Sequence, residues 1–257
     1  GGVRGGPRGP YEQSGRAEHY EAALRRLADD GRLFPCHRTR RELRDIASAP
    51  HGPGGSAYPA HLRPADLKPD WFSVFVDAEP GSRAAALRFR VEPGVVTFQD
   101  GLFGAVSQDV AEEVGDFVLK RRDGLYAYQL AVIVDDLAMG VSEVVRGVDL
   151  LDSTARQIQL IEALGGVAPA WIHVPLIVDA DGEKLSKRHE SLTLLSLRAA
   201  GVGPEQLTGY LAHSAGLLDR VRPCRPRDLV ESFDWTRVSR RSWTLPDDIV
   251  QRLLAIS

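Results

Sequence analysis

The middle of the chain alternates short apolar segments with an amphipathic helix, and this alternation restricts the possible folds more than any other feature. Residues 131–134 (AVIV), 144–145 (VV) and 172–178 (IHVPLIV) are apolar and rich in β-branched side chains, as buried strands are. Residues 153–166 have apolar side chains at helical spacing behind a serine suited to capping the helix. Strands that alternate with a crossover helix predict a parallel sheet and an α/β fold.

Regions outside this core predict helices or disorder. Residues 15–31 carry apolar side chains three and four apart and end at a glycine, so we expect a helix there. Residues 40–46 predict an Arg-rich helix, and residues 191–256 predict three or four short helices. The first ten residues, GGVRGGPRGP, contain nothing that can pack, and we expect them to be disordered.

Three short strands are expected between these helices. Residues 72–76, 86–91 and 95–98 are rich in β-branched or aromatic side chains, and Pro-Gly turns separate them. We interpret them as a small antiparallel meander inserted into the α/β fold.

Composition excludes several classes of protein. The chain has 257 residues, 43% of them hydrophobic, which suits one large or two small packed domains. No apolar run reaches the about 18 residues of a membrane span, and no secretion signal is recognisable, so we expect a cytoplasmic protein without membrane contact. Cys36 and Cys224 are then expected to be free thiols. The net charge of −3 provides no overall positive field for nucleic acid, although a local patch can still bind RNA.

The distribution of lysine points to one loop. The chain contains 28 Arg but only four Lys, and two of the four are Lys184 and Lys187 in the segment EKLSKR, residues 183–188. An ammonium group on a flexible stem suits a loop that follows the phosphates of ATP through a reaction. The alternative is an ordinary solvated basic turn, but retention of lysine in an Arg-rich chain favours the functional interpretation.

A second candidate group surrounds Arg146. Tyr128 and Arg146 flank an apolar core, and Arg146 follows two valines and precedes a glycine, as expected at the end of a strand. Ligands of open α/β sheets bind beyond the carboxyl ends of the strands, where an arginine can hold a carboxylate. The alternative is a structural salt bridge from Arg146 to Asp135, Asp136 or Asp149.

Together these segments resemble a known family. Residues 126–158 (YAYQLAVIVDDLAMGVSEVVRGVDLLDSTARQI) resemble class I glutamyl-tRNA synthetases, and residues 173–188 (HVPLIVDADGEKLSKR) look like the strand and KMSKS signature loop of these enzymes. Supporting matches are YEQS at 11–14, FQD at 98–100 and DFVLKRRDG at 116–124. The resemblance covers about residues 11–250 and is strongest to the short members, the glutamyl-queuosine tRNA(Asp) synthetases.

The resemblance implies a Rossmann-type class I aminoacyl-tRNA synthetase catalytic domain with a small inserted α/β subdomain and a C-terminal helical region. The expected parts are a disordered leader at 1–10, a helical part of the catalytic domain at 11–35, the inserted subdomain at 36–100, the Rossmann-type catalytic half with the KLSKR loop at 101–190 and the helical C-terminal region at 191–257.

The same resemblance implies a ligase that activates L-glutamate with ATP and Mg²⁺ and transfers it to tRNA. In the short members the acceptor is queuosine in the anticodon of tRNA(Asp). A full-length glutamyl-tRNA synthetase would continue into an anticodon-binding domain after the helical region, so the length favours the short members. We expect a monomer.

Site residues carry over by position. Tyr128 and Arg146 match the glutamate-binding Tyr and Arg of the family, and Lys184 and Lys187 match the two catalytic lysines of the signature loop. The ATP-binding segment comprises Lys184, Leu185, Ser186, Lys187 and Arg188.

One family signature is not found in these residues. A His-x-Gly-His-like motif on an N-terminal helix contributes to the ATP site of the family, and none of the seven histidines stands three residues from another. The first strand and this signature helix would precede residue 11, so we interpret the chain as N-terminally truncated. We expect the chain as written to form little glutamyl-adenylate, as ATP–pyrophosphate exchange would test.

The metal site of many relatives is also altered. Relatives bind zinc through Cys-x-Cys and Tyr-x-x-x-Cys, but here Cys36 and Tyr58 are the only matches, with Arg38 and Leu62 at the other cysteine positions. Tetrahedral zinc needs four donors, which His37 and His61 would have to complete, and we do not expect zinc.

Two other functions remain open from the sequence. The chain could be a fragment of an ordinary glutamyl-tRNA synthetase, or a catalytically inactive synthetase-like protein that binds RNA or a partner. Residues 1–67 hold 11 Arg against eight Asp and Glu, a mild positive excess that could contact phosphate. The retained Lys184, Lys187, Tyr128 and Arg146 favour the synthetase.

Overall fold

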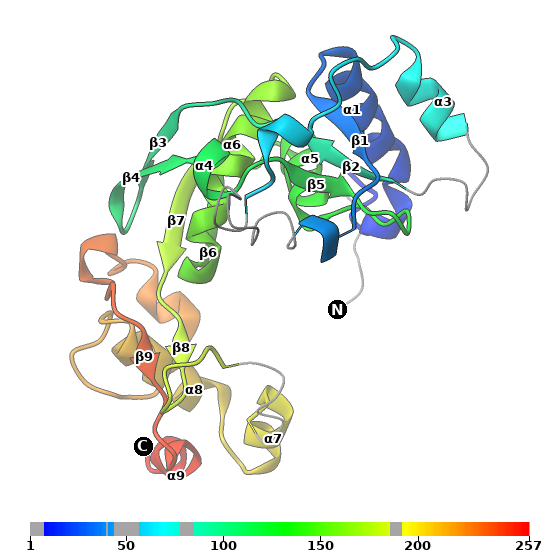
Figure 1. Cartoon of the computed structure of the whole chain (residues 1–257). Helices are drawn as coiled ribbons and strands as arrows, with labels where there is room; N and C mark the ends of the chain where they lie inside the picture. Colours follow the sequence, from blue (N-terminus) through cyan, green and yellow to red (C-terminus); the bar gives the residue numbers. More distant parts are fainter. Residues whose placement is uncertain (1–7, 40, 44–56, 78–84, 186–191, 257) are drawn as a thin grey trace. The chain divides into compact units, whose positions relative to one another are not determined.

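The computed structural model describes residues 8–39, 41–43, 57–77, 85–185 and 192–256 (Figure 1). The chain divides into two compact units. The first unit comprises Gly1–Phe98, Ala105–Val144 and Asp152–Ala170, and the second comprises Gln99–Gly104, Val145–Leu151 and Trp171–Ser257. None of the described helices is both long and apolar enough to cross a membrane.

The helices (α, and η for 3-10 helices) and strands follow one another along the chain. They are η1 (Gln13–Gly15), α1 (Ala17–Asp29), β1 (Leu33–Cys36), η2 (Ala60–Leu62), α3 (Trp71–Asp77), β2 (Ala86–Phe89), β3 (Val95–Asp100), β4 (Gly104–Asp109), α4 (Val110–Glu113), β5 (Phe117–Lys120), α5 (Tyr128–Met139), β6 (Glu143–Gly147), η3 (Val148–Ser153), α6 (Thr154–Ala163), β7 (Ala170–Val174), β8 (Ile177–Val178), α7 (Leu194–Ala199), α8 (Pro204–Ser214), η4 (Pro226–Leu229), η5 (Trp235–Arg237), β9 (Trp243–Thr244) and α9 (Ile249–Leu254).

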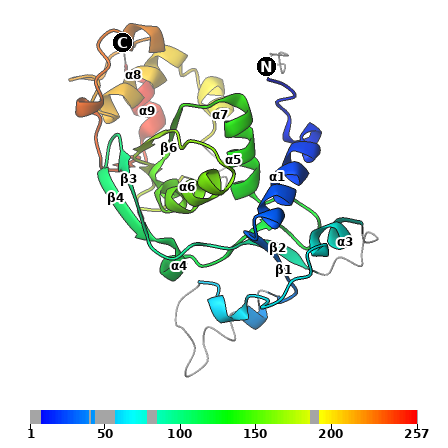
Figure 2. The same ribbon diagram turned by 90° about the horizontal axis from the view of Figure 1, so that it is seen from above.

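The first unit contains an antiparallel sheet in the strand order β1-β2-β5. α1 contacts both β1 and α5 (Figure 2). The buried side chains of α1 are Tyr20, Leu24 and Leu27, whose spacing of four and three residues places them on one face of the helix. This is the pattern that predicts a helix within residues 15–31, and the prediction is confirmed.

The prediction of a strand at 131–134 is wrong, because these residues belong to α5. Leu130, Ala131, Ile133 and Val134 are all buried in this helix, which contacts α1, α6 and β5. Neighbours on several sides make the helix apolar over much of its circumference, so the run of side chains imitates a buried strand. The helix ends at Gly140, which takes the left-handed conformation with φ +67° that favours glycine.

The expected meander is also wrong. Residues 72–76 lie in the helix α3. β2 and β3 are strands as predicted, but they belong to different sheets: β2 is the central strand of the first sheet, whereas β3 pairs with β7 in parallel. Turn residues between two strands do not determine which partner each strand finds, because pairing depends on distant segments.

Other expectations are confirmed, are wrong in part or fall partly outside the described residues. The strand at 144–145 lies in β6, and the helix at 153–166 contains α6. The single strand expected at 172–178 is wrong in its continuity, because the segment forms two strands: Val174 ends β7 and Ile177 begins β8. Of the Arg-rich helix predicted at 40–46, residues 41–43 are helical and the others lie outside the described residues.

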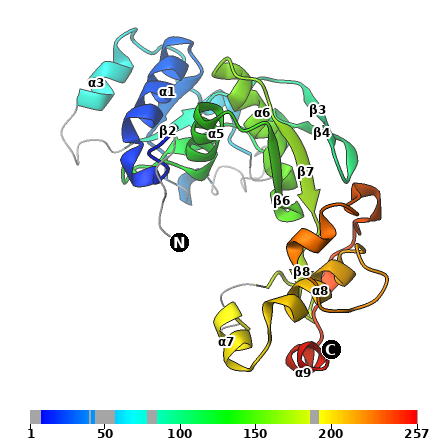
Figure 3. The same cartoon turned by 180° about the vertical axis from the view of Figure 1, so that it is seen from behind.

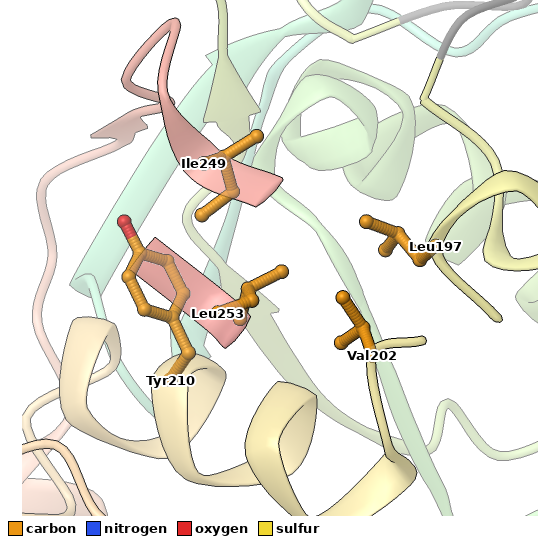
Figure 4. Close-up of a cluster of buried hydrophobic side chains, with 5 residues drawn as sticks. All are labelled: Leu197, Val202, Tyr210, Ile249 and Leu253. Atoms are coloured by element: carbon orange, nitrogen blue, oxygen red, sulfur yellow. The ribbon is translucent and has the colours of Figure 1, made fainter. Parts of the chain in front are cut away.

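In the second unit, α7, α8 and α9 share a small apolar core. Figure 4 shows side chains from these helices and the segments beside them pointing toward one another. They are Leu197, Val202, Tyr210, Ile249 and Leu253. The short strands β8 and β9 pair in parallel next to these helices. The helical C-terminal region expected from the sequence therefore also contains a strand.

A second sheet has four strands in the order β4-β3-β7-β6. β3 and β7 pair in parallel at Asp100↔Trp171, and β6 lies along the other side of β7 (Figure 3). Asp100 is the last residue of β3 and Gly147 is the last residue of β6. The carboxyl end of β3 therefore lies beside the start of β7, and residues after parallel strands of α/β sheets are where ligands commonly bind.

Candidate functional site

The guanidinium of Arg146, next to the last residue of β6, is held by several contacts. Its Nε donates a hydrogen bond to Nε2 of His173 at 2.9 Å, and its Nη2 donates to the carbonyl oxygen of Leu150 at 3.1 Å. The guanidinium carbon lies 4.7 Å from the ring centroid of Trp171. Two hydrogen bonds in the plane and a ring against its face restrict how the guanidinium can turn.

His173 and Asp100 form a buried pair next to Arg146, with exposed fractions of 0% and 4%. Asp100 Oδ2 lies 2.6 Å from His173 Nδ1 and accepts the His173 backbone N–H at 3.1 Å. Asp100 Oδ1 accepts the backbone N–H groups of Leu102 and Phe103 at 3.0 and 2.8 Å. Burial by itself raises the pKa of Asp100, but these hydrogen bonds outweigh burial and hold the pKa below its ordinary value. The carboxylate is therefore ionised.

The sheet places these side chains together by simple strand geometry. Trp171 and His173 are two residues apart on β7, so both project from the same face. Their rings are stacked, with centroids 6.5 Å apart and an angle of 14° between planes. Arg146 reaches both rings from the neighbouring strand β6.

Lys184 follows β8 and a tight turn. The side chain of Asp179 accepts the backbone N–H groups of Asp181 and Glu183 at 3.0 and 2.9 Å, and Gly182 has a φ of +80°. A turn that needs a positive φ at this position favours glycine, and the Asp-x-x-Gly sequence fits it. The turn returns the chain so that Lys184 forms an antiparallel bridge with the end of β8.

The ammonium of Lys184 pairs with Asp149. Its Nζ lies 2.5 Å from Asp149 Oδ2, and the two side chains are 55% and 32% exposed. A Cβ atom at Gly147 would lie 2.5 Å from Asp149 Oδ1 and 3.1 Å from the Leu176 side chain, so glycine leaves the room that Asp149 occupies. Because the pair is half exposed, an anionic ligand could replace Asp149 as the partner of Lys184 at modest cost.

Of the other predicted loop residues, Leu185 donates its backbone N–H to the carbonyl oxygen of Ile177 at 3.2 Å. Ser186, Lys187 and Arg188 lie outside the described residues. The structure thus places Arg146 and Lys184 in the same unit. Asp149 forms an ion pair with Lys184, and its charge also acts on His173.

Tyr128 belongs to the first unit, where it is the first residue of α5 and is 51% exposed. The neighbouring Gln129 donates to Ser153 Oγ at 3.4 Å and accepts from Gln157 Nε2 at 2.7 Å. These contacts attach the first turn of α5 to α6. Tyr128 therefore presents an accessible ring and hydroxyl from a fixed backbone.

Asp135, one of the alternative partners considered for Arg146, has other partners in the first unit. Its carboxylate lies 2.5 Å from Arg16 Nε and accepts from Gln13 Nε2 at 3.0 Å. The Tyr20 hydroxyl donates to both carboxylate oxygens at 3.1 and 3.0 Å. Burial, together with this hydrogen bond, raises the pKa of Tyr20 to about 12.

Cys36 and Tyr58, the weak candidates for zinc, lie together in the apolar interior of the first unit. The Cys36 thiol donates to the Tyr58 hydroxyl at 3.8 Å, and that hydroxyl donates to the carbonyl oxygen of Leu62 at 3.2 Å. Burial raises the pKa of Tyr58, which favours the neutral phenol. Within the described ranges, no three His, Cys, Asp or Glu side chains gather in a way that would hold a metal ion.

Sequence reasoning assigned no role to Asp100, His173 or Trp171, although all three lie in or beside the segments that carry the family resemblance. One signal was available. A histidine two residues after a tryptophan, in a strand that is otherwise apolar, places two rings on one face and requires a polar partner for the buried imidazole. The identity of that partner could not be read from the pattern, because Asp100 is 73 residues away.

Comparison with known proteins yields one family and close relatives. Residues 4–251 match the family described as tRNA synthetases class I (E and Q), catalytic domain. The glutamyl-Q tRNA(Asp) synthetase of Nitratidesulfovibrio vulgaris is 46% identical over 250 residues, and that of Symbiobacterium thermophilum is 45% identical over 251 residues. Both alignments cover 97% of this chain and 76% of the relative.

Solved structures share the fold. A glutamate tRNA ligase from Elizabethkingia meningosepticum, in complex with its amino acid, superposes with a TM-score of 0.77 at 23% identity. A glutamate-tRNA synthetase from Elizabethkingia anophelis has a TM-score of 0.76 at the same identity. The superpositions cover 97% of this chain, which spans about half of those chains, 54% and 55%. They confirm the expected α/β fold of a class I catalytic domain.

Proposed function

Because the chain belongs to the catalytic-domain family of class I tRNA synthetases for glutamate and glutamine, we propose that it activates L-glutamate with ATP and transfers it to tRNA. The proposed acceptor is queuosine in the anticodon of tRNA(Asp), and the proposed compartment is the cytoplasm. One observation carries this proposal. The chain is 46% and 45% identical, over 97% of its length, to proteins named glutamyl-Q tRNA(Asp) synthetase.

Arg146 is the proposed partner of a glutamate carboxylate. A guanidinium offers paired N–H donors that match the two oxygens of a carboxylate, and its charge persists at any physiological pH. The contacts of Arg146 with His173, Leu150 and Trp171 reduce the conformational entropy that is lost when glutamate binds. Tyr128 is proposed to supply an additional hydrogen bond to glutamate.

Lys184, with Lys187 and the segment 185–188, is the proposed binding element for the phosphates of ATP. The α-carboxylate of glutamate attacks the α-phosphorus of ATP, and pyrophosphate leaves with the electrons of the broken P–O bond. The positive charge of Lys184 stabilises the negative charge that develops on the phosphates. Mg²⁺ is proposed to enter with ATP, bound mainly by phosphate oxygens, as it commonly is in phosphoryl-transfer sites.

In the second step, a hydroxyl of the queuosine ring attacks the acyl carbon of glutamyl-adenylate. An ester forms, AMP leaves, and the hydroxyl proton passes to solvent or to the departing phosphate. The protein's role in both steps is mainly to position reactants and to stabilise charge.

The test uses the full product of the gene with labelled glutamate, ATP and Mg²⁺. Three tRNA preparations separate the possible acceptors: tRNA(Asp) that contains queuosine, the same tRNA with its 3′-terminal adenosine removed, and tRNA(Asp) from cells unable to make queuosine. We expect equal glutamate incorporation into the first two and none into the third.

Other results would contradict the proposal. Incorporation that disappears with the terminal adenosine would identify the 3′ end as the acceptor, as in an ordinary glutamyl-tRNA synthetase. Binding of tRNA without ATP–pyrophosphate exchange would identify an inactive RNA-binding relative.

A further inference from the structure

The hydrogen bonds of Asp100 determine which nitrogen of His173 carries the proton. An ionised carboxylate only accepts hydrogen bonds, so the close contact of 2.6 Å between Asp100 Oδ2 and His173 Nδ1 requires a proton on Nδ1. The Asp100 carboxylate cannot turn away, because two backbone N–H groups bind its other oxygen. Asp100 therefore selects the Nδ1–H tautomer of His173.

In this tautomer, Nε2 of His173 has a lone pair that faces Arg146. The Nε–H of Arg146 donates to it at 2.9 Å, which an imidazole protonated on Nε2 could not accept. Burial disfavours the charged ring, and the positive charge of Arg146 opposes it further, so the pKa of His173 lies below its ordinary value. The histidine is thus a neutral acceptor that neither cancels nor repels the charge of Arg146.

We propose that His173 is a positioning residue for glutamate binding: Asp100 holds it in the Nδ1–H tautomer, and its Nε2 orients the guanidinium of Arg146 toward a glutamate carboxylate. This inference rests on the proposed function and adds two residues to its site. The hydrogen bond to Nε fixes the rotation of the guanidinium about its long axis, while the Trp171 ring fixes its plane.

A purely structural role is the competing explanation, in which His173 only satisfies Asp100 and fills the space under Trp171. Two substitutions distinguish these explanations, because each retains a different nitrogen position. In His173→Asn the amide can occupy the position of Nδ1 and keep the contact with Asp100, but the shorter side chain does not reach Nε of Arg146. In His173→Gln the amide oxygen can reach the position of Nε2 and accept from Arg146, while the side-chain contact with Asp100 is lost.

The measurement is ATP–pyrophosphate exchange by the full product of the gene, with KM determined separately for glutamate and ATP. We expect His173→Asn to raise the KM for glutamate about tenfold or more, as the loss of a charge-assisted hydrogen bond does. His173→Gln is expected to stay within about threefold of the wild type, as rescue of the same bond requires. The KM for ATP is expected to stay unchanged in both variants.

Asp100→Asn extends the test to the tautomer. An amide N–H in place of Oδ2 would donate to Nδ1 and force the proton to Nε2, where it would face the Nε–H of Arg146. We expect the KM for glutamate to rise at least as much as in His173→Asn. The matched control is His213→Asn in the same unit, where Nδ1 contacts only a carbonyl oxygen, that of Leu218 at 2.9 Å, and no change in either KM is expected.

The reverse order overturns the inference: a larger rise in the KM for glutamate in His173→Gln than in His173→Asn would show that the Asp100 contact, and hence packing, is what matters. Equal effects in the two variants would overturn it as well.

A second measurement separates this inference from the proposed function. Nitrogen-15 NMR of labelled histidine in the wild type is expected to show His173 neutral, with the proton on Nδ1. A proton on Nε2 overturns the inference whatever the activity. Absence of glutamate-dependent exchange in the wild type would instead contradict the proposed function, and the NMR spectrum would still decide the state of His173.

Discussion

Each unit of the molecule contains a buried carboxylate connected to an arginine, and the two connections differ. In the first unit, Asp135 binds Arg16 directly, with 2.5 Å between Oδ1 and Nε, and the Arg16 side chain is 1% exposed. In the second unit, Asp100 is connected to Arg146 through His173. The charge of Arg16 is buried and neutralised by Asp135, whereas Arg146 is partly exposed next to a neutral imidazole.

The difference shows how the same residue types serve two purposes. A direct buried ion pair neutralises the arginine and connects the start of α1 to α5, so it stabilises the fold only while both partners are present. A neutral histidine between carboxylate and guanidinium orients the arginine without adding a charge of its own. We therefore interpret the Asp135–Arg16 pair as structural and the Asp100–His173–Arg146 series as support for a binding group.

The largest effect is expected from Asp135→Asn. This change leaves the charge of Arg16 buried without its carboxylate, which costs about 3–5 kcal/mol of unfolding free energy. Urea unfolding measures it. Tyr20→Phe, which removes only the hydroxyl that donates to Asp135, is the control and is expected to cost about 1 kcal/mol. The structural interpretation fails if Asp135→Asn proves no more destabilising than Tyr20→Phe.

The next largest effect is expected from Arg146→Lys on the KM for glutamate. Lysine keeps the charge but loses the fork of N–H groups that contacts His173 and Leu150. We expect the KM for glutamate to rise about 10- to 100-fold, or about 1.4–2.8 kcal/mol, in ATP–pyrophosphate exchange. The exposed Arg240→Lys in the same unit is the matched control. A rise common to both variants would argue against a specific role for Arg146.

A change of pH is expected to have a smaller effect, on the unfolding free energy. The pKa of His173 lies below its ordinary value, because burial and the charge of Arg146 outweigh the opposite effects of Asp100 and Asp149. The unfolded chain therefore binds a proton as pH falls below about 6.5 while the folded chain resists it, so stability is present above this pH and is lost below it, by at most about 1.4 kcal/mol per pH unit.

Urea unfolding at about pH 7.5 and about pH 5.5 tests this sign, with His173→Gln as the variant that cannot titrate at this position. The wild type is expected to lose more stability between the two pH values than His173→Gln. Identical losses would mean that His173 does not resist protonation in the folded chain.

The smallest effect is expected from Asp149→Asn. Lys184 and Asp149 are half exposed, and such pairs contribute about 0–1 kcal/mol, so the unfolding free energy is expected to change by less than about 1 kcal/mol. Removal of the carboxylate frees the ammonium of Lys184, and the KM for ATP is expected to fall or stay constant. A marked increase in the KM for ATP would show that Asp149 orients Lys184 rather than competes with ATP.

Prediction from sequence succeeded where the signal is local and failed where it depends on distant partners. The prediction of α1 is correct, because Tyr20, Leu24 and Leu27 repeat at helical spacing. Residues 131–134 were assigned the wrong structure, because a helix covered on several sides loses that repeat. Gly140 could have indicated a helix here, since a glycine directly after an apolar run is typical of a helix end.

By itself, the sequence determined the family, the α/β class and two of the charged groups of the candidate site. Arg146 and Lys184 could be found because each lies in a contiguous segment whose residue types already indicate its chemistry. Only the tertiary structure decided that Asp100 and His173 support Arg146, and that Asp135 belongs to Arg16. These pairings join residues 27 to 119 positions apart, and they are set by which strands and helices lie side by side, which no local pattern records.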